Sequence, residues 1–319
     1  MSTTSDPGGQ AGGAVTGDQK RLLIIGASGF LGGHVWDRAV AAGLEVCTAG
    51  RFELPASPRH HLVDLARGDE DEVAALVATV APDVVVNCAG ATAGDPDVLA
   101  AVNVTGTYAL ARAMLLAGRP ARLVYLGSAA EYGYSDPGVP VSESAAPRPA
   151  GLYGTTKLAG TRLVQLAATS GLDAVVLRVF NPVGPGAPEE SLPGRLAAEL
   201  RRALTGGAEV RLGSLDAVRD FVDARDMADA VVAAATGPLL PHRVVNIGSG
   251  RGVPVRSLAK ELLTISGCTA AIHEDAPGSV RSAGLMWQQA DITRATAELG
   301  WQPRRDLATS LNDLWEAIR

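Results

Sequence analysis

The feature that most constrains the fold of this chain is an alternation, starting at Arg21, of short apolar runs with longer segments of helical periodicity. The apolar runs lie at residues 22–25, 44–48, 62–63, 84–88, 123–126 and 174–179, and helical segments lie between them at about 30–42, 69–80, 96–117 and 152–170. Parallel strands need long crossover connections, which helices normally supply. We therefore predict an α/β fold built around a doubly wound parallel sheet.

The pattern changes near residue 180, where the segment 181–186 is rich in Pro and Gly. Helices are expected after it at about 191–204, 224–236, 255–266 and 306–318. We expect residues 20–180 to form one large domain and residues 181–319 to form mainly a smaller C-terminal α/β lobe for substrate. An apolar strand at 244–247 is expected to return to the main sheet. Residues 1–19 contain five glycines and almost no large apolar side chain, which predicts a disordered tail.

Charge and composition exclude several classes of function. The net charge of −6 and the pI of about 5.4 disfavour a nucleic-acid partner, because phosphate binding needs a basic face. The chain has no run of about 18 apolar residues and no apolar stretch near its N-terminus, so we expect no membrane span and a cytoplasmic location. Cys47, Cys88 and Cys268 lack the spacing of metal ligands, so neither a disulfide framework nor a metal site is expected.

A glycine-rich segment joins the first apolar run to the first helical segment. Gly26, Gly29 and Gly32 lie three residues apart where a strand is expected to turn into a helix. Glycine at such a turn lets the backbone approach the pyrophosphate of a dinucleotide at the positive end of the helix. We therefore predict a dinucleotide site formed by Gly26, Ser28, Gly29, Phe30, Leu31 and Gly32.

The residue after the second apolar run indicates which dinucleotide binds. An NAD-selective protein would place an acidic side chain there for the ribose 2′-hydroxyl, but this chain has Arg51. A guanidinium group would pair with a 2′-phosphate, so we favour NADP(H). The alternatives are a solvated surface arginine and, through nearby Glu53, NAD(H).

Further cofactor contacts are expected after the third and fourth runs. Asp64 and Leu65 close the third run and are candidates for holding the adenine amine. Ala89 and Gly90 follow the fourth run and are candidates for lining the cofactor. Capping or turn roles would explain these residues equally well.

Tyr153 and Lys157 are the main candidates for chemistry. Only three of the 28 basic residues are lysines. In a chain that otherwise uses arginine, a lysine at position 157 suggests that arginine could not replace it there. Four residues apart on a helix, a phenol and an ammonium group share one face, and the positive charge stabilises the phenolate. A tyrosine tuned in this way can pass a proton to a carbonyl oxygen. The pair taken alone could also arise by chance.

With these segments in order, the chain resembles the extended short-chain dehydrogenase/reductase superfamily, in its nucleotide-sugar epimerase/dehydratase group. The resemblance runs from about Arg21 to the C-terminus. It rests on segments 26–32, 64–65, 82–90, 103–107, 127–133, 153–157, 178–186, 219–223 and 246–250. Segments 213–226 and 300–303 are most similar to those of 4-ketoreductases, notably GDP-4-keto-6-deoxymannose reductases and reductases of deoxysugar pathways. The resemblance implies a Rossmann-type domain over residues 20–180 that binds NADP(H), and a homodimer formed through the helix that carries Tyr153.

The resemblance also assigns residues to catalysis. Ser128 would hydrogen-bond the substrate carbonyl, Tyr153 would donate the proton, and Lys157 would tune Tyr153 and bind the nicotinamide ribose. Asn103 would lie near Lys157, where support through water and a purely structural role are equally compatible with the sequence.

The same resemblance assigns residues to the substrate diphosphate. Asn181 would donate an amide hydrogen bond to a phosphate oxygen, and Arg219 and Arg281 would be its charge partners. For each arginine the alternative is a solvated surface residue.

One departure from the family pattern narrows the reaction. Related 4,6-dehydratases place Asp-Glu directly after the catalytic Ser or Thr, because elimination of water needs an extra acid and base. This chain has Ala129-Ala130 there, and Glu131 comes one residue later. The expected activity is therefore NADPH-dependent reduction of the C4 ketone of a nucleoside-diphosphate 4-keto-6-deoxyhexose. The alternatives are a nucleotide-sugar 4-epimerase with retained NAD and, remotely, a nonenzymatic NADP-sensing regulator.

Overall fold

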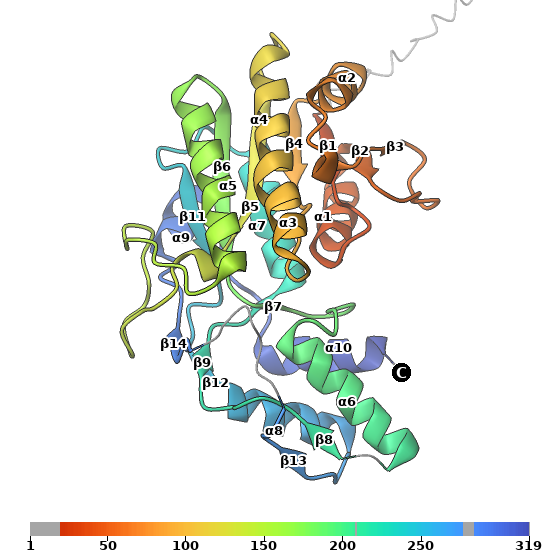
Figure 1. The fold of residues 1–319 in the computed structure, drawn as a ribbon, viewed down its shortest axis with the longest axis vertical. Coiled ribbons are helices and arrows are strands. Elements are labelled where there is room, and N and C mark those ends of the chain that lie inside the picture. Colours follow the sequence, from red (N-terminus) through yellow and green to blue (C-terminus); the bar gives the residue numbers. More distant parts are fainter. Residues whose placement is uncertain (1–19, 208, 277–283, 319) are drawn as a thin grey trace, which may run out of the picture.

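The computed structural model describes residues 20–207, 209–276 and 284–318 (Figure 1), so the tail expected at residues 1–19 lies outside the described residues. The central feature is a seven-stranded sheet in which every pairing is parallel. Its strands are β1 (Arg21–Ile25), β2 (Glu45–Gly50), β3 (His60–Leu62), β4 (Val84–Asn87), β5 (Arg122–Ser128), β6 (Asp173–Val179) and β11 (Val244–Ile247), in the spatial order β11-β6-β5-β4-β1-β2-β3. The predicted α/β fold with a doubly wound parallel sheet is confirmed.

The order of the strands reverses between β1 and β4. From β1 the chain runs outward to β2 and β3 on one side, and then to β4, β5 and β6 on the other side. Such a reversal leaves a crevice at the carboxyl ends of the strands, where ligands bind in sheets of this kind. The segments that follow β1, β4 and β5 meet at this edge, and they carry most of the predicted cofactor and catalytic residues.

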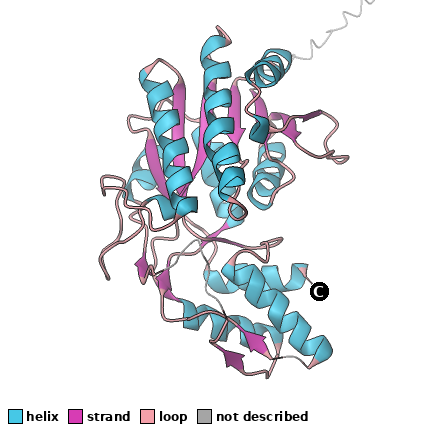
Figure 2. Cartoon of the chain, viewed as in Figure 1, coloured by secondary structure: helices cyan, strands magenta, loops and turns pink. Residues whose placement is uncertain are grey.

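Helices cover both faces of the sheet (Figures 1 and 2). One face packs against α2 (Glu70–Val80), α4 (Gly106–Leu116) and α5 (Leu152–Thr169). The other face packs against α1 (Phe30–Ala41), α7 (Ala224–Thr236) and α9 (Thr293–Leu299). Because both faces are covered, the central strands are nearly continuous runs of Val, Ile and Leu.

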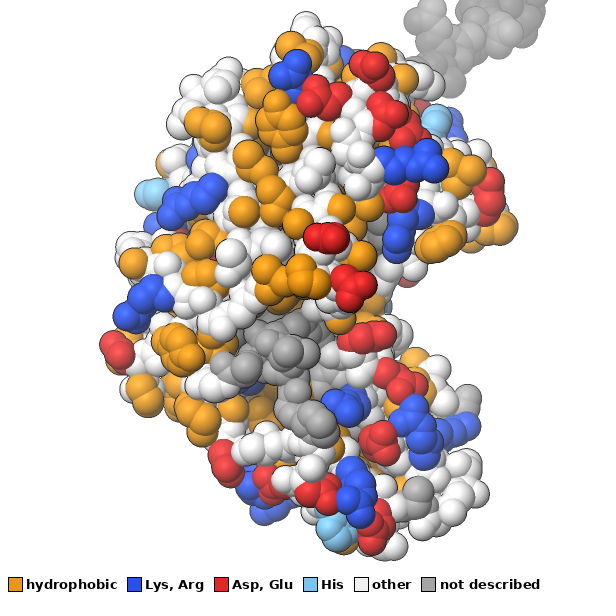
Figure 3. Space-filling view, viewed as in Figure 1, with side chains coloured by type: hydrophobic (Ala, Val, Ile, Leu, Met, Phe, Trp, Pro, Cys, Tyr) orange, Lys and Arg blue, Asp and Glu red, His pale blue; other side chains and the backbone are white. Residues whose placement is uncertain are grey.

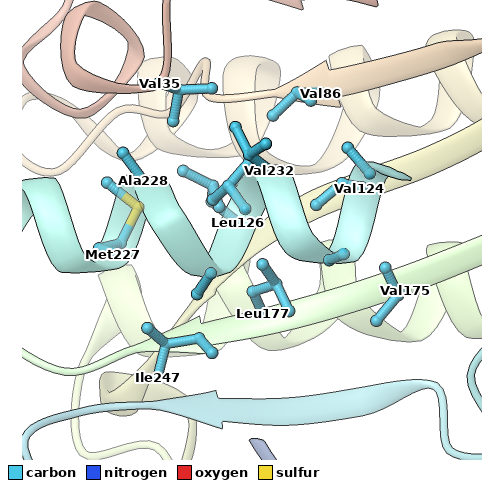
Figure 4. Close-up of a cluster of buried hydrophobic side chains, with 14 of the residues drawn as sticks. Val35, Val86, Val124, Leu126, Val175, Leu177, Met227, Ala228, Val232 and Ile247 are labelled. Atoms are coloured by element: carbon cyan, nitrogen blue, oxygen red, sulfur yellow. The ribbon is translucent and has the colours of Figure 1, made fainter. Parts of the chain in front are cut away.

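The place of α7 differs from the sequence-based expectation, which assigned residues 224–236 to the smaller lobe. Figure 4 shows Met227, Ala228 and Val232 of this helix among apolar side chains of α1 and of strands in the main sheet. The helix is rich in buried alanines, and small side chains let its backbone lie close to α1 and the sheet. Helical periodicity predicts that a face is buried, but it does not say which surface covers that face.

The other C-terminal elements form a smaller group below the main sheet in Figure 1. Helices α6 (Leu192–Gly206), α8 (Val255–Ser266) and α10 (Leu307–Ala317) share an apolar core with the parallel pair β8 (Val210–Arg211) and β13 (Ile272–His273). Two small sheets lie between this core and the main sheet. They are β7 (Pro182–Val183) with β10 (Val222–Asp223), and β9 (Val218–Arg219) between β12 (Val253–Pro254) and β14 (Trp287–Gln288).

A long apolar helical stretch precedes β5. Here α3 (Pro96–Ala100) continues through a π-helical turn (Ala101–Thr105) into α4. In the described part of the chain, Pro96–Leu116 is the one helix that is long and apolar enough to cross a membrane. Half of it is buried inside the protein, and core helices of soluble proteins pass the same test, so it is weak evidence for a membrane span. Tyr108 and Leu116 of α4 and Leu166 of α5 are exposed, and Figure 3 shows apolar side chains over these two helices.

Gly160 allows α5 to lie against β5, because an added Cβ would lie 2.3 Å from the Tyr125 hydroxyl oxygen and 2.6 Å from the Asn103 carbonyl oxygen. We predict that Gly160→Ala lowers the free energy of unfolding by about 1–3 kcal/mol, since α5 must move away from the sheet. The matched control is Gly206→Ala in α6, where nothing lies within 4 Å of the added Cβ. That change should raise the free energy of unfolding by up to about 1 kcal/mol. Urea unfolding measures both values, and equal effects would contradict the prediction.

Candidate functional site

The turn between β1 and α1 is built from glycines that leave no room for side chains. Gly26 has a φ of 83°, and a Cβ added there would lie 2.8 Å from the amide nitrogen of Ala89. A Cβ added to Gly32 would lie 2.0 Å from the carbonyl oxygen of Gly26. The first turn of α1 has no acidic residue, and Gly29 at its N-cap has no side chain that competes for the helix amides. The turn therefore suits the pyrophosphate of a dinucleotide.

The other predicted residues of this turn differ in exposure. Ser28 is exposed beside the turn, and Phe30 and Leu31 are half-buried. A Cβ added to Gly50, at the end of β2, would lie 4.0 Å from the Ser28 hydroxyl oxygen. Ser28 therefore lies beside the strand end that precedes Arg51.

The predicted ribose site lies at the carboxyl ends of β2 and β3. Arg51 is exposed there and lines an open pocket together with Asp64 and Arg67. Two guanidinium groups, of Arg51 and Arg67, therefore border this pocket, whereas the sequence analysis identified only Arg51. Asp64 accepts a hydrogen bond from the amide of Ala66 (3.1 Å) and caps a short 3₁₀ turn. The side chain of Leu65 is buried, which leaves only its backbone for an adenine contact.

Asn103 ties the loop after β4 to α5. It is buried on the π-helical turn, where its amide oxygen accepts a hydrogen bond from the Ala91 amide (3.1 Å). Its amide nitrogen donates to the Ala91 carbonyl (2.9 Å) and the Thr156 hydroxyl (3.1 Å). A Cβ added to Gly90 would lie 3.5 Å from this amide oxygen and 3.9 Å from the Lys157 ammonium nitrogen. Asn103 therefore has a structural role beside Lys157 and the predicted cofactor loop.

Ser128, Tyr153 and Lys157 come from two elements that the fold brings together. Ser128 is the last residue of β5, and Tyr153 and Lys157 lie one turn apart near the start of α5. Gly154 lets α5 approach the turn after Ser128, because an added Cβ would lie 2.4 Å from the Ala130 carbonyl oxygen. The three predicted catalytic residues therefore gather at the carboxyl end of β5, beside the loop that follows β4.

Lys157 is only 5% exposed. Its ammonium group donates a hydrogen bond to the Leu126 carbonyl oxygen (2.5 Å) and lies 4.3 Å from the centre of the Tyr125 ring. Burial lowers the pKa of Lys157, and the negative charge of a Tyr153 phenolate opposes this shift. By the same interaction, a charged Lys157 stabilises the phenolate that proton donation would leave on Tyr153.

The turn after Ser128 is a capping box. The Ser128 hydroxyl oxygen accepts a hydrogen bond from the Ala130 amide (3.2 Å), and the Glu131 carboxylate accepts one from the Ser128 amide (2.8 Å). Because the hydroxyl oxygen accepts from the backbone, its proton stays available for a substrate carbonyl. The other carboxylate oxygen of Glu131 pairs with Arg178 of β6 in the interior, so Glu131 does not take the place of a dehydratase acid.

Asn181 lies beside the segment that carries Arg219, where the main sheet joins the smaller lobe. Asn181 follows β6 and donates its side-chain amide to the Asp220 carbonyl oxygen (2.7 Å), next to Arg219. Its φ of 22° is a conformation that Asn tolerates better than most residues. Arg281, the third predicted substrate residue, lies outside the described residues.

Arg219 is a buried cation that has no acidic partner among the described residues. It is 6% exposed, and its guanidinium donates to the carbonyl oxygens of Val218 (2.8 Å) and Leu285 (2.5 Å). It forms no ion pair with any residue that the structure describes. Burial lowers the pKa of Arg219 to about 10. A bound anion would compensate this charge, which fits the assignment to a diphosphate.

Two residues near the site were not found from the sequence. Gln288 of β14 is buried and donates to the Ala129 carbonyl oxygen (2.8 Å), which ties the small sheet to the turn after Ser128. Tyr125 lies beneath Lys157. The only feature of the sequence that could have identified it is that it is an aromatic residue within an otherwise aliphatic strand. Over the described ranges, the structure has no group of three His, Cys, Asp or Glu side chains that could hold a metal ion.

Residues 22–248 match the model of the NAD dependent epimerase/dehydratase family, and this range includes the glycine turn and all three predicted catalytic residues. The chain belongs to this family. It is 39% identical over 304 residues to the dTDP-6-deoxy-L-talose 4-dehydrogenase (NAD(P)(+)) of Kitasatospora kifunensis, covering 93% of this chain and 95% of that relative. It is 29% identical to the GDP-6-deoxy-D-mannose reductase of Pseudomonas aeruginosa, covering 93% and 98% of the two chains.

A solved structure of the same class is similar over nearly the whole chain. The UDP-glucose 4-epimerase of Thermus thermophilus in complex with NAD superposes with a TM-score of 0.83 at 26% identity, covering 94% of this chain and 99% of the other. The resemblance inferred from the sequence segments is confirmed at the level of the family and its fold.

We predict that Gly32→Ala weakens binding of the nicotinamide dinucleotide at least about tenfold, because the new methyl group must displace the Gly26 carbonyl from the turn. The matched control is Gly33→Ala on the next residue, where the added Cβ makes only an ordinary contact of 3.7 Å. A fluorescence titration with NADPH measures both dissociation constants. Unchanged affinity in Gly32→Ala would place the cofactor away from this turn.

Proposed function

We propose that this protein is an NADPH-dependent reductase that converts the C4 ketone of a nucleoside-diphosphate 4-keto-6-deoxyhexose to an alcohol. The observation that carries the proposal is the gathering of Ser128, Tyr153 and Lys157 beside a dinucleotide-type turn, while the nearby acid Glu131 is buried in an ion pair with Arg178. This set supplies one proton and no second acid or base. It suits addition of hydride and a proton to a carbonyl group, and it does not suit elimination of water.

Each residue has a defined part in the reduction. The glycine turn after β1 would hold the pyrophosphate of the reduced cofactor, Lys157 would hold its nicotinamide ribose, and the bound cofactor would supply the hydride for the new C–H bond at C4. The Ser128 hydroxyl donates a hydrogen bond to the carbonyl oxygen and orients it. Tyr153 gives its proton to the same oxygen as negative charge develops there, and the nearby Lys157 ammonium stabilises the phenolate. The products are the C4 alcohol and the oxidised cofactor.

The pocket at the ends of β2 and β3 supports a preference for NADPH. Arg51 and Arg67 both line it, and guanidinium groups are well suited to a 2′-phosphate. The acidic residues Asp64 and Glu72 also line this pocket, and the Asp64 carboxylate is already engaged as a cap. The dehydrogenase of Kitasatospora kifunensis carries NAD(P)(+) in its name, which supports use of either cofactor in a relative.

The two relatives described above support a 6-deoxyhexose substrate. One is named for oxidation at C4 of dTDP-6-deoxy-L-talose, which is the reverse of ketone reduction, and the other is named as a reductase of a GDP-linked 6-deoxysugar. Arg219 and Asn181 supply the cation and the amide that a diphosphate requires. We favour a dTDP-linked substrate, because the dTDP-sugar dehydrogenase has the higher identity of the two.

A nucleotide-sugar 4-epimerase is the second candidate. The similar structure from Thermus thermophilus is such an enzyme in complex with NAD, and a 4-epimerase also transfers hydride at C4. A nonenzymatic NADP sensor is disfavoured, because this chain keeps Tyr153 and Lys157. Arg51 favours reduction, since an epimerase retains NAD.

We also propose a homodimer formed through α4 and α5. Tyr108, Leu116 and Leu166 expose apolar side chains on these helices. Apolar surface of this kind is often covered by a partner subunit.

The deciding experiment follows absorbance at 340 nm with NADPH or NADH and a panel of dTDP-, GDP- and UDP-linked 4-keto-6-deoxyhexoses. The purified protein is first tested for bound nucleotide. Stoichiometric oxidation of NADPH with one of these sugars supports the reductase. Retained NAD, with exchange of C4 epimers and no net oxidation, would identify an epimerase instead.

Within that assay, Tyr153→Phe removes the proposed proton donor. We expect kcat to fall about 100- to 10,000-fold with little change in KM for the sugar, because the phenol acts in proton transfer. Steady-state kinetics and a cofactor titration measure the effects on kcat and on binding separately. Full turnover in Tyr153→Phe would rule out this mechanism.

Arg219→Met tests the diphosphate site. We expect KM for the nucleotide sugar to rise about 10- to 100-fold, because a charge-assisted hydrogen bond to phosphate is lost. The free energy of unfolding without ligand should change by less than about 1 kcal/mol, since no ion pair is broken and a buried charge is removed. Arg202→Met is the control in the same lobe, because Arg202 is an exposed residue that pairs with Glu189 and Glu199. An unchanged KM in Arg219→Met would place the diphosphate elsewhere.

A further inference from the structure

A fully buried carboxylate lies directly behind Ser128. Glu131 has no exposed surface, and one of its carboxylate oxygens accepts a hydrogen bond from the Ser128 amide (2.8 Å). The other oxygen accepts from the guanidinium of Arg178 (2.8 Å), which is also buried. Neither carboxylate oxygen faces solvent, so Glu131 can act on the reaction only through its neighbours.

The surroundings of Glu131 hold its carboxylate in one place. A Cβ added to Gly127 would lie 2.7 Å from the Glu131 carboxylate oxygen and 2.9 Å from Cγ1 of Val176, so a side chain at this position would displace its neighbours. Arg178 lies over the Tyr132 ring, 4.4 Å from its centre, and the Tyr132 hydroxyl donates to the side chain of Asn246 (2.7 Å). This chain of contacts runs from the turn after β5 to β11.

Stability alone gives little reason for such a pair. Taking two charges out of water is costly, and well-packed apolar side chains often stabilise a core as well as a buried ion pair does. A buried ion pair that touches the backbone of a predicted catalytic residue is therefore a candidate for a role in the reaction.

The first effect of Glu131 is on the Ser128 hydroxyl. The two hydrogen bonds of the capping box fix both the Ser128 amide and the Ser128 hydroxyl oxygen, which accepts from the Ala130 amide. With its oxygen held in this way, the hydroxyl proton is directed away from the turn.

The second effect is electrostatic and concerns Lys157. The groups whose charges act on the Lys157 ammonium are Tyr153 on its own helix, Glu131 after β5 and Cys88 after β4, and the centre of the Tyr125 ring in β5 lies 4.3 Å from it. Burial lowers the pKa of Lys157, and Tyr153, then Glu131, then Cys88 oppose this shift. Burial also raises the pKa of the Cys88 thiol to about 12, so it is uncharged near neutral pH.

We propose that Glu131, held in place by Arg178, is a positioning residue for the reduction, which fixes the Ser128 hydroxyl and helps to keep Lys157 charged. The inference rests on the proposed function, because carbonyl reduction is the activity that it refines. In this chain the carboxylate of Glu131 lies behind Ser128. There it supports Ser128 and Lys157 and does not reach the substrate.

The main test is Glu131→Gln in the full-length protein. We expect kcat to fall about 10- to 100-fold while KM for the sugar changes less than about twofold, because Glu131 orients reacting groups and touches no ligand. Loss of its charge lowers the pKa of Lys157 further, and the charged form of Lys157 is the active one. The alkaline limb of the kcat profile should therefore move to lower pH. A kcat and a pH profile equal to those of the wild type would overturn the proposal.

Asp226→Asn is the matched control. Asp226 is a buried carboxylate on α7 that accepts hydrogen bonds from two backbone amides, of Arg304 and Arg305 (both 2.8 Å), and pairs with the Arg305 guanidinium. Its replacement should lower the thermal midpoint and leave kcat and its pH profile unchanged. The same kinetic loss in both variants would mean that Glu131 serves only the fold.

A double variant covers the case in which an unpaired Arg178 unfolds the protein. Glu131→Gln combined with Arg178→Met removes both buried charges, so its thermal midpoint should recover towards that of the wild type. A positioning role predicts that kcat stays low and that the alkaline limb stays shifted. Recovery of kcat together with stability would show that Glu131 only neutralises Arg178.

Amide hydrogen exchange separates failure of this inference from failure of the proposed function. If the wild-type protein were inactive on every sugar of the panel, the proposed function would be refuted. The hydrogen bond from the Ser128 amide to Glu131 could still be tested by amide exchange, because that measurement needs no substrate. Glu131→Ala should speed exchange of the Ser128 amide at least about tenfold, because its acceptor is lost, and Asp226→Asn should not. Unchanged exchange at Ser128 would overturn the positioning role whatever the substrate is.

Discussion

The site depends on burial of the Lys157 ammonium group against β5. A charge taken out of water is costly unless polar or aromatic groups replace the water. The Leu126 carbonyl oxygen and the face of Tyr125 supply these contacts, but only because α5 lies very close to the strand. Gly154 and Gly160 leave the room for that approach. The same approach brings the start of α5, which carries the predicted proton donor, to the turn after β5.

Three buried cations in this acidic chain are compensated in different ways. Lys157 uses a carbonyl oxygen and an aromatic ring, and Arg178 uses the carboxylate of Glu131. Within the described part of the chain, the guanidinium of Arg219 bonds backbone carbonyl oxygens and no carboxylate. A cation that is neutralised inside the protein, such as Arg178, can shape a site. A cation without an acid among the described residues, such as Arg219, can attract an anionic ligand. This contrast separates two arginines that the sequence alone presents as similar.

Local structure was the part most readily predicted from the sequence. The helix expected at 152–170 is observed as Leu152–Thr169, and the strand expected at 174–179 is observed as Asp173–Val179. Strands covered on both faces are continuous apolar runs, so they are easily recognised. The role of Asp64 was harder to predict, because an adenine contact and a helix cap both call for an acidic side chain at this position. Its hydrogen bond to Ala66 shows that it caps a turn.

The sequence by itself determined the alternation of strands and helices, the glycine turn at Gly26–Gly32 and the spacing of Tyr153 and Lys157. These features depend on residues within a few positions of one another, so sterics and helical geometry specify them locally. Only the tertiary structure decided that α7 covers the main sheet, that Glu131 faces Arg178 and that the Arg219 guanidinium bonds backbone carbonyl oxygens. Glu131 and Arg178 are 47 positions apart, and Arg219 meets a carbonyl 66 positions away. Periodicity predicts that a face is buried, but the partner of a buried charge is fixed only when distant strands pack together.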